Sequence, residues 1–178
     1  MKAAGKYNVA HSLNHAAAHI WPASRRSLTW AVAPGTRKDA IDPLAKQSIE
    51  PWSVASGRNF TFKCNSEKNY NIYNASDIKI SSRTKATDPA LDGKGNVIAY
   101  GTPPTEGIMV LDGDETWAPG PLAGATDIGS VGLHEMGNIL ALEHSSDEKT
   151  VMFPSIGLGV RKGLGESDIA APKNLYGF

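Results

Sequence analysis

The stretch that most constrains this chain runs from Ser130 to His144 and reads SVGLHEMGNILALEH. It lies in a segment, residues 128–142, whose apolar residues recur at helical spacing. On a helix, residues four apart share one face, so His134 and position 138 project in the same direction. Two imidazoles placed in this way can hold one zinc ion, and an acid beside them, here Glu135, can take a proton from a zinc-bound water. Position 138, however, is Asn.

A third imidazole lies within reach of the same face. His144 follows His134 by ten residues, a spacing that lets it approach once the helix has ended and the chain has turned back. Val151-Met152-Phe153-Pro154-Ser155 then forms a Met-containing turn of the type that floors such sites. Asn138 offers only a neutral amide oxygen, a poor zinc ligand beside imidazole nitrogen.

The rest of the chain predicts an α+β domain with one twisted mixed sheet of five strands backed by three helices. Alternating apolar residues predict strands at residues 28–33, 59–64, 77–82, 97–101 and 107–111. Helical spacing predicts helices at residues 38–55, 128–142 and 167–176. Pro51 should bend or end the first of these helices, and Pro172 should distort the last.

The bulk composition limits the partners. The 178 residues fit one domain, and 18 basic against 18 acidic residues give a formal net charge of zero. That balance favours neither nucleic acid nor an anionic membrane as a partner, and no apolar run approaches the ~20 residues of a membrane helix. The sequence leaves the oligomeric state open.

The first 20 residues are expected to form a leader that is disordered or loosely docked, with the domain itself spanning residues 21–178. His11, His15 and His19 are spaced by four and would share one helical face. One reading is a solvated, Ala-rich leader with incidental histidines; the other is an accessory metal site. The leader lacks the unbroken apolar core of a signal peptide.

Two N-glycosylation sequons give weak support for secretion. Asn59-Phe60-Thr61 and Asn74-Ala75-Ser76 are compatible with secretion and with glycosylation of Asn59 and Asn74. Cys64 is the only cysteine, so no internal disulfide can form, and we expect it to be a small, partly buried hydrophobe.

These motifs together resemble the catalytic domain of plant matrix metalloproteinases, a matrixin branch of the metzincins. The family motif is H-E-x-x-H-x-x-G-x-x-H followed by a Met-turn. The likeness covers residues 21–177 and includes, in order, WPAS, LTWAV, NFTF, ASDIKI, DGKGNV, LDGDETW, EHSS, VMFPSI, ESDI and NLYG. The resemblance implies the matrixin fold, a secreted protein and a peptide laid along the strand near residues 97–102.

The resemblance also implies roles for individual residues. His134 and His144 would be zinc ligands, Glu135 the general base and Met152 the Met-turn residue, while Leu133, Met152 and Pro154 would floor an apolar substrate pocket. Asn138 stands where the family has its second His, so zinc binding should be weakened or lost. Glu143 could complete the ligand set.

The end of the helix departs from the family as well. Ala141 replaces the Gly that lets the backbone turn, and a positive φ at Ala141 would be strained. His144 is therefore expected to be at risk of displacement.

The family's second, structural zinc ion is expected to be absent from this chain. Its four ligand positions align with Lys85, Thr87, Tyr100 and Val110, none of which is a suitable ligand. Asp88 lies one residue away from the second position.

A calcium site is expected to survive. The resemblance assigns it to the loop residues Asp92, Gly93, Gly95 and Val97 together with Asp112 and Glu115. Three acids and backbone carbonyls form an oxygen-rich set that suits Ca²⁺. The alternative is a turn rich in Asp and Gly for conformational reasons.

Three functions remain open. The first is a matrix-metalloproteinase-like protein that is proteolytically inactive or severely impaired and serves a binding, defence or seed-type role. The second is a working zinc endopeptidase that cleaves extracellular proteins, with Asn138 or another residue as the third ligand. The third is an inhibitor or ligand-binding protein that takes a protein or peptide in the altered cleft. Zinc content separates the second from the other two.

Overall fold

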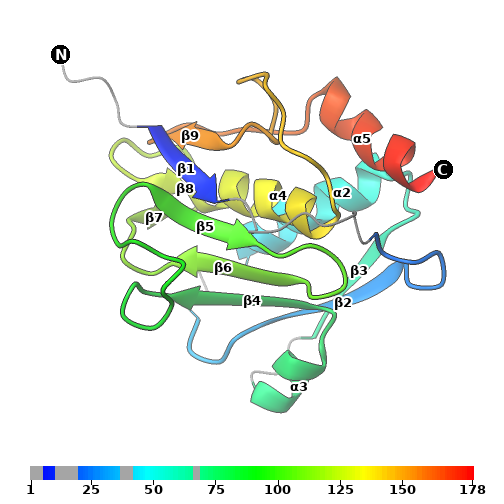
Figure 1. Ribbon diagram of the computed structural model, residues 1–178, viewed down its shortest axis with the longest axis horizontal. Coiled ribbons are helices and arrows are strands. Elements are labelled where there is room, and N and C mark those ends of the chain that lie inside the picture. The colour runs from blue at the N-terminus through cyan, green and yellow to red at the C-terminus, as the bar shows by residue number, and fades with distance from the viewer. Residues whose placement is uncertain (1–5, 11–19, 37–41, 66–68) are drawn as a thin grey trace.

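The computed structural model describes residues 6–10, 20–36, 42–65 and 69–178, and these residues build one large sheet with helices packed behind it (Figure 1). The sheet has seven strands in the order β3-β2-β4-β6-β5-β1-β9. The strands are β1 (Lys6–Ala10), β2 (Ser27–Val32), β3 (Thr61–Cys64), β4 (Ile78–Arg83), β5 (Val97–Gly101), β6 (Ile108–Asp112) and β9 (Ser155–Gly157). Strands β5 and β6 pair antiparallel, as do β1 and β9, and the other neighbours are parallel.

Within the described ranges, five helical segments accompany the sheet. They are η1 (Leu44–Ile49), α2 (Glu50–Ala55), α3 (Tyr70–Ala75), α4 (Ile128–Ile139) and α5 (Glu166–Tyr176). Two short strands, β7 (Trp117–Ala118) and β8 (Thr126–Asp127), form a separate parallel pair just before α4. In Figure 1, α4 and α2 lie behind the sheet, whereas α3 lies at its lower edge.

The α+β class and all five predicted strands are confirmed, but the strand count was too low. Strands β1 and β9 extend the sheet beyond β5, and β1 lies within the segment expected to be a leader. Strand β1 alternates polar and apolar residues as the predicted strands do, so its pattern was present in the sequence and was missed, whereas the three residues of β9 are too few to show one. The rest of the leader, with His11, His15 and His19, lies outside the described residues.

The first predicted helix differs in its hydrogen bonding. Between Leu44 and Ile49 the chain is a π-helix, in which the Glu50 N–H donates to the Ala45 carbonyl five residues back. The chain then continues as α2 with Pro51 in its first turn, where a missing N–H costs no intrahelical bond. Pro51 therefore marks a change of helix type. Pro172 lies inside α5, which continues to Tyr176.

The remaining differences are local. The short helix α3 was not predicted; it begins after Asn69, whose side chain accepts a hydrogen bond from the Ile72 N–H at 2.9 Å. Cys64 lies in an exposed position at the end of the edge strand β3, and the partial burial that its side chain retains raises the pKa of its thiol.

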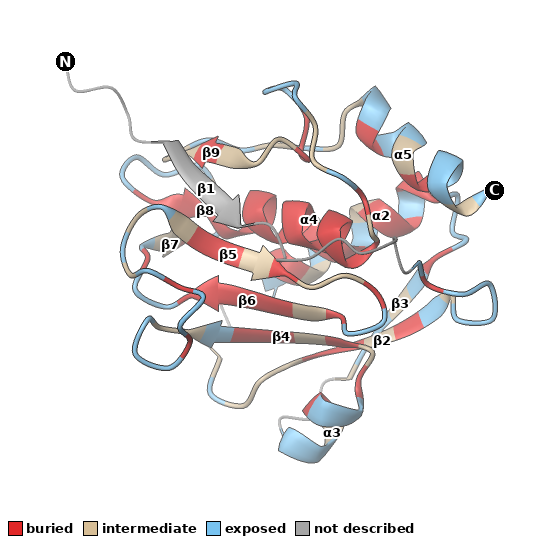
Figure 2. Ribbon diagram, in the orientation of Figure 1, coloured by how far each residue is buried: buried red, intermediate tan, exposed pale blue. Residues whose placement is uncertain are grey.

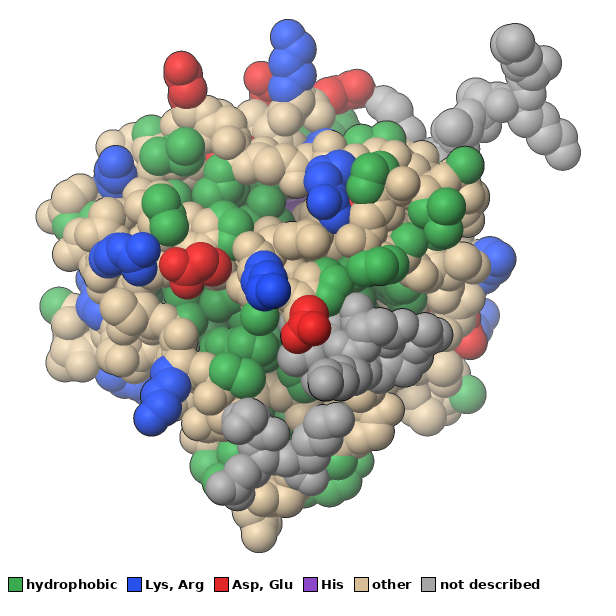
Figure 3. Space-filling model, turned by 180° about the vertical axis from the view of Figure 1, so that it is seen from behind, with side chains coloured by type: hydrophobic (Ala, Val, Ile, Leu, Met, Phe, Trp, Pro, Cys, Tyr) green, Lys and Arg blue, Asp and Glu red, His purple; other side chains and the backbone are tan. Residues whose placement is uncertain are grey.

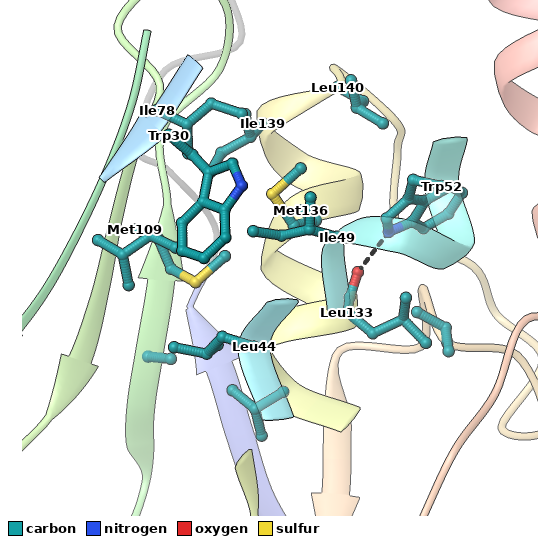
Figure 4. Packing of buried hydrophobic residues seen from close by; sticks show 14 of the residues in the cluster. Trp30, Leu44, Ile49, Trp52, Ile78, Met109, Leu133, Met136, Ile139 and Leu140 are labelled. Atoms are coloured by element: carbon teal, nitrogen blue, oxygen red, sulfur yellow. Dashed lines mark hydrogen bonds between the residues drawn. The ribbon is translucent and has the colours of Figure 1, made fainter. Parts of the chain in front are cut away.

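Helix α4 is the centre of the core. All twelve of its residues are buried, in contrast to the exposed faces of α3 and α5 (Figure 2). The indole N–H of Trp52 donates to the Leu133 carbonyl at 2.8 Å, which ties α2 to the middle of α4 (Figure 4). The indole of Trp21 donates to the Ile139 carbonyl at 2.9 Å and holds its far end. Among the described residues, no helix has the length and apolarity to span a bilayer.

Candidate metal centre

Helix α4 buries His134, Glu135 and Asn138 in the core, and Glu135 and Asn138 lie against strand β5 at Gly101. Their exposed fractions are 2%, 0% and 7%. The approach of the strand is so close that a Cβ at Gly101 would lie 2.8 Å from the Glu135 carbonyl oxygen and 2.9 Å from its Oε2. Only a residue without a side chain fits there, so Gly101 sets the distance between strand and helix at this site.

The end of α4 returns the chain toward the site. Ala141 adopts φ 61°, the left-handed conformation. The Leu142 N–H donates to the Gly137 carbonyl and the Ala141 N–H to that of Asn138, both at 2.9 Å, which together form a Schellman cap. The chain thus makes the turn with Ala where the family uses Gly. The helix ends at Ile139, earlier than predicted, because the cap closes it.

His144 does reach His134, so the expected displacement does not occur. Their Nε2 atoms lie 3.1 Å apart and the ring centroids 4.9 Å apart. His134 Nδ1 lies 2.8 Å from the Val151 carbonyl oxygen. If Nδ1 is the protonated nitrogen that donates to this carbonyl, the Nε2 lone pair faces His144, as in imidazoles that ligate a metal.

The turn that supplies the Val151 carbonyl is itself held by two residues that sequence reasoning did not single out. Asp168, buried in the first turn of α5, accepts from the Val151 N–H at 3.0 Å and the Gly165 N–H at 2.9 Å. The ammonium of Lys162 donates to the Thr150 carbonyl at 2.9 Å and lies over the Phe153 ring. An acid in the first turn of a helix was a visible signal for Asp168, whereas nothing in the sequence pointed to Lys162.

Asn138 pairs with Glu135. Its side-chain nitrogen donates to Glu135 Oε2 at 3.0 Å, while Glu135 Oε1 has no hydrogen-bond partner among the described residues. Complete burial raises the pKa of Glu135 to about 8, against the hydrogen bonds from Asn138 and the Gly101 N–H, which lower it.

The donor set at this centre is two imidazole nitrogens. Within the part of the chain that the structure describes, no group of three His, Cys, Asp or Glu residues is placed to hold a metal ion. Glu143, expected as a substitute ligand, is an exposed residue. His134 and His144 fit one zinc ion as a pair, but the third protein ligand of a catalytic zinc site is missing from that set.

A small cavity of about 10 Å³ lies beside His134. It is lined by Ser130, Val131, His134, Val151, Phe153, Ser155, Ile156 and Lys162. Leu133 and Met152, expected to floor a substrate pocket, lie in the hydrophobic core, and the half-buried Pro154 does not line this cavity either. Met152 instead packs against Gly137 of α4, where a Cβ would lie 2.3 Å from its sulfur.

The six residues assigned to calcium lie in two neighbouring turns and at the strand ends beside them, with Val97 at the start of β5 and Asp112 at the end of β6. The Val97 N–H donates to Asp92 Oδ1 at 3.1 Å, and the Gly95 N–H donates to Glu115 Oε1. Gly93 has φ 86°, which suits the tight loop. Asp112 is fully buried, and its Oδ2 has no hydrogen-bond partner among the described residues. Burial raises the pKa of Asp112, and the nearby charges of Asp114 and Asp92 add to this effect.

The four positions of the family's structural zinc ion carry other contacts. Tyr100 and Val110 face each other across β5 and β6, and the Tyr100 hydroxyl donates to Asp88 Oδ2 at 2.6 Å. The Thr87 hydroxyl donates to the Thr84 carbonyl at 3.1 Å, and the Lys85 N–H donates to Asp114 at 3.2 Å.

The two sequon asparagines are both exposed. The Asn59 side chain donates to the Ser56 carbonyl at 2.9 Å. Asn74 lies in α3, close to Ser76, whose buried hydroxyl donates to the Ile72 carbonyl at 2.8 Å.

A buried helix with adjacent His and Glu, a returning His and a Met-containing turn define the class of zinc-dependent peptidase folds. Comparison with known proteins agrees, since the Matrixin family model matches residues 20–177. The chain belongs to the matrixin family.

Plant and animal relatives support this assignment. The chain is 33% identical over 170 residues to metalloendoproteinase 5-MMP of Arabidopsis thaliana, covering 88% of this chain and 45% of that protein. It is 31% identical over 168 residues to metalloendoproteinase 1 of Glycine max, covering 89% and 53%. The rabbit (Oryctolagus cuniculus) macrophage metalloelastase is 30% identical over 151 residues, covering 81% and 30%. The chain thus spans about half the length of these plant relatives.

Proposed function

We propose that this chain is a matrix-metalloproteinase-like protein whose zinc motif is degenerate and whose proteolysis is absent or severely impaired. It would serve instead in a binding, defence or seed-type role. The observation that carries the proposal is Asn138: its amide nitrogen is engaged with Glu135 at 3.0 Å, at the position where a third imidazole would be needed.

The ligand count supports this reading. Two imidazoles leave half of a tetrahedral zinc shell to water, whereas catalytic zinc sites use three protein ligands. Even a change in a group that only supports a ligand costs about 10–100-fold in metal affinity, so the loss of a ligand should cost at least that much. Zinc, when bound, would polarise a water; with this donor set we assign no catalytic step to it.

The first experiment measures zinc and calcium per chain on protein purified without added metal, for the wild type and Asn138→His. We expect substoichiometric zinc and no peptide cleavage in the wild type, and a gain of zinc in the variant. A tightly held zinc ion at one per chain in the wild type would overturn the proposal. Peptide cleavage that a Glu135→Ala control abolishes would then identify an active enzyme.

That outcome is the alternative function, a zinc-dependent metalloendopeptidase. Two observations favour it. The Nε2 atoms of His134 and His144 lie 3.1 Å apart, so two imidazoles are placed to bind one zinc ion, and several relatives are named metalloendoproteinases. Asn138, after release of Glu135, or another residue would have to complete the ligand set.

We also propose that Ca²⁺ binds between the loop of residues 92–97 and the acids Asp112 and Glu115. The fully buried, unpartnered Oδ2 of Asp112 supports this, because a buried carboxylate with acidic neighbours is stabilised by a cation. Thermal unfolding with CaCl₂ and with EGTA tests it. We expect calcium to raise the midpoint in the wild type but not in Asp112→Asn, and an equal effect on both would count against the site.

We propose that the structural zinc ion has been replaced by a hydrogen-bonded network centred on Asp88. Asp88 accepts from Tyr100 at 2.6 Å and from Arg83 at 3.1 Å, which fastens the following loop to β4 and β5. Its pKa is lowered: burial would raise it, but hydrogen bonds from Tyr100, Ala90 and Arg83 outweigh burial. Asp88→Asn should therefore destabilise the chain without changing its metal content; a loss of bound zinc would contradict the proposal.

Secretion is the corresponding proposal for localisation. The exposed side chains of Asn59 and Asn74, each in a sequon, support it. Expression in a plant or insect secretory host, followed by glycosidase treatment, should show a mobility shift that Asn59→Gln and Asn74→Gln remove. An unglycosylated product retained in the cytosol would count against it.

A further inference from the structure

We propose that a pocket on the outer face of the sheet, away from the metal centre, binds an uncharged saccharide unit. We call it the tyrosine pocket, and its polar lining comes from Thr36, Tyr70, Tyr73, Ser81, Ser82 and Arg83. It shares none of these residues with the cavity beside His134, so it stands apart from the function proposed above.

The position of the pocket follows from the sheet. Strands β2 and β4 are parallel neighbours, and the pocket lies where β2 has just ended and β4 is ending. Ile80 points into the core with no exposed surface, so the next residue along β4, Ser81, points to the opposite face. Helix α3 supplies the two tyrosines as the other wall. The carboxyl ends of parallel strands are a common place for ligands to bind.

Its size suits a small ligand. The cavity is about 380 Å³, within the ~300–1,000 Å³ of typical ligand pockets. By contrast, the cavity beside His134 is about 10 Å³.

Ser81 provides the observation that points to a ligand. The residue is 5% exposed, and its hydroxyl oxygen has no hydrogen-bond partner among the described residues. A buried hydroxyl without a partner is uncommon, because it loses its hydrogen bonds to water without replacement. The oxygen itself is buried, so the hydroxyl would have to rotate about χ1 to face the pocket, where a polar group of a ligand would supply the missing bond.

The charges disfavour strongly ionic ligands. Arg83 Nη1 is 3.1 Å from Asp88 Oδ2, so the positive charge at the pocket is already balanced. Asp88 in turn is occupied by Tyr100 and does not line the pocket. Since no carboxylate is found among the described lining residues, a cation has no partner there. A neutral ligand is therefore favoured.

The aromatic side chains favour a ring. Tyr70 and Tyr73 meet edge to face, with centroids 6.3 Å apart and an interplanar angle of 89°. Tyr70 remains 61% exposed, which leaves ring surface open to the apolar face of a ligand. Ser, Thr and Tyr hydroxyls both donate and accept, as the hydroxyls of a sugar do. A peptide unit is also neutral, but its amide N–H only donates and its carbonyl only accepts, so it uses this lining less fully.

The test is a titration of the ¹⁵N-labelled chain with three neutral trisaccharides, cellotriose, mannotriose and galactotriose, followed by two-dimensional NMR. At least one should give saturable shifts centred on residues 33–36, 70–73 and 81–83. Ser81→Ala and Tyr70→Ala should each weaken that binding about tenfold, which corresponds to about 1.4 kcal/mol. The matched controls Ser167→Ala and Leu122→Ala, at exposed positions elsewhere, should leave it unchanged.

Several outcomes would overturn the proposal. These are no saturable shift with any of the three sugars, binding that survives both pocket variants, or stronger binding at the same residues by triglycine or inorganic phosphate. Urea unfolding of Ser81→Ala guards against a folding defect. Because an unpartnered hydroxyl contributes little to folding, this variant should be at least as stable as the wild type. Marked destabilisation would show that Ser81 is already satisfied and would also overturn the proposal.

Discussion

Asn138 donates its side-chain N–H to Oε2 of Glu135 at 3.0 Å, within one turn of a helix that is buried along its whole length. The amide thus does two things at once. It occupies the position from which an imidazole would face the metal, and it satisfies one oxygen of an acid that has no exposed surface. The substitution is therefore integrated into the core and is expected to contribute to its stability.

The first prediction concerns this pair. Asn138→Ala leaves both Glu135 oxygens without a side-chain donor and should destabilise the chain by about 1–3 kcal/mol. With its pKa raised to about 8, Glu135 is largely uncharged at pH 7, and Glu135→Gln keeps a neutral side chain that still accepts from Asn138, so it should cost less than Asn138→Ala. Urea unfolding of both variants at pH 7 measures the difference. Equal destabilisation would mean that the pair does not act as described.

The second prediction concerns the end of α4. Ala141 has φ 61°, a conformation that costs a residue with a Cβ roughly 1–2 kcal/mol. Ala141→Gly removes this cost but makes the unfolded chain more flexible, so the net gain should be about 0.5–1 kcal/mol. Ala170→Gly, inside α5, is the control and should lose about 0.5–1 kcal/mol. A loss at both positions in thermal unfolding would contradict the prediction.

The third prediction concerns the contact of β5 with α4. Gly101→Ala would place a methyl group 2.8 Å from the Glu135 carbonyl oxygen and 2.9 Å from its carboxylate. Since backbone cannot easily give way, we expect a loss of about 1–3 kcal/mol. Gly163→Ala, where no atom lies within 4 Å of the added Cβ, should be nearly neutral. The comparison is made by chemical denaturation, and a neutral Gly101→Ala would show that strand and helix can separate.

The fourth prediction concerns pH. Asp127 precedes α4, is fully buried, and binds Arg161 at 3.0 Å and the Ser130 hydroxyl at 2.7 Å. Burial would raise the pKa of Asp127, but the hydrogen bonds from Arg161 and Ser130 outweigh it, so its pKa lies below the ordinary value. A lowered folded-state pKa stabilises the fold above the unfolded-state value of about 3.9, and this stabilisation is lost as pH falls below it.

Arg161→Met should therefore lower the free energy of unfolding at pH 7. Below about pH 4 that free energy should fall less steeply in the variant than in the wild type. Because Arg161 is partly exposed, we expect a cost of about 2 kcal/mol, less than for a fully buried pair. Lys149→Met, at an exposed position, is the control. If the free energy of unfolding falls as steeply at low pH in Arg161→Met as in the wild type, this ion pair is not the source of the acid sensitivity.

The sequence alone determined the class of fold and the spacing of the metal centre. Periodicity placed five strands and helix α4, because alternation and helical spacing are properties of each segment by itself. The offsets among His134, Asn138 and His144 likewise follow from helix geometry and chain length. The sequence also predicted backbone strain at Ala141, since a left-handed conformation is costly for any residue with a Cβ.

Only the tertiary structure decided the rest. It decided that β1 and β9 pair with each other and that β1 also pairs with β5, since pairing depends on segments far apart in the chain, and that Asn138 bonds to Glu135. It brought Lys162 and Asp168 to the turn behind His134, and Ser81 to a pocket with tyrosines from another element. These contacts join residues distant in sequence or depend on how the helix packs. Burial, hydrogen bonding and pKa arise from that packing, and no local pattern encodes them.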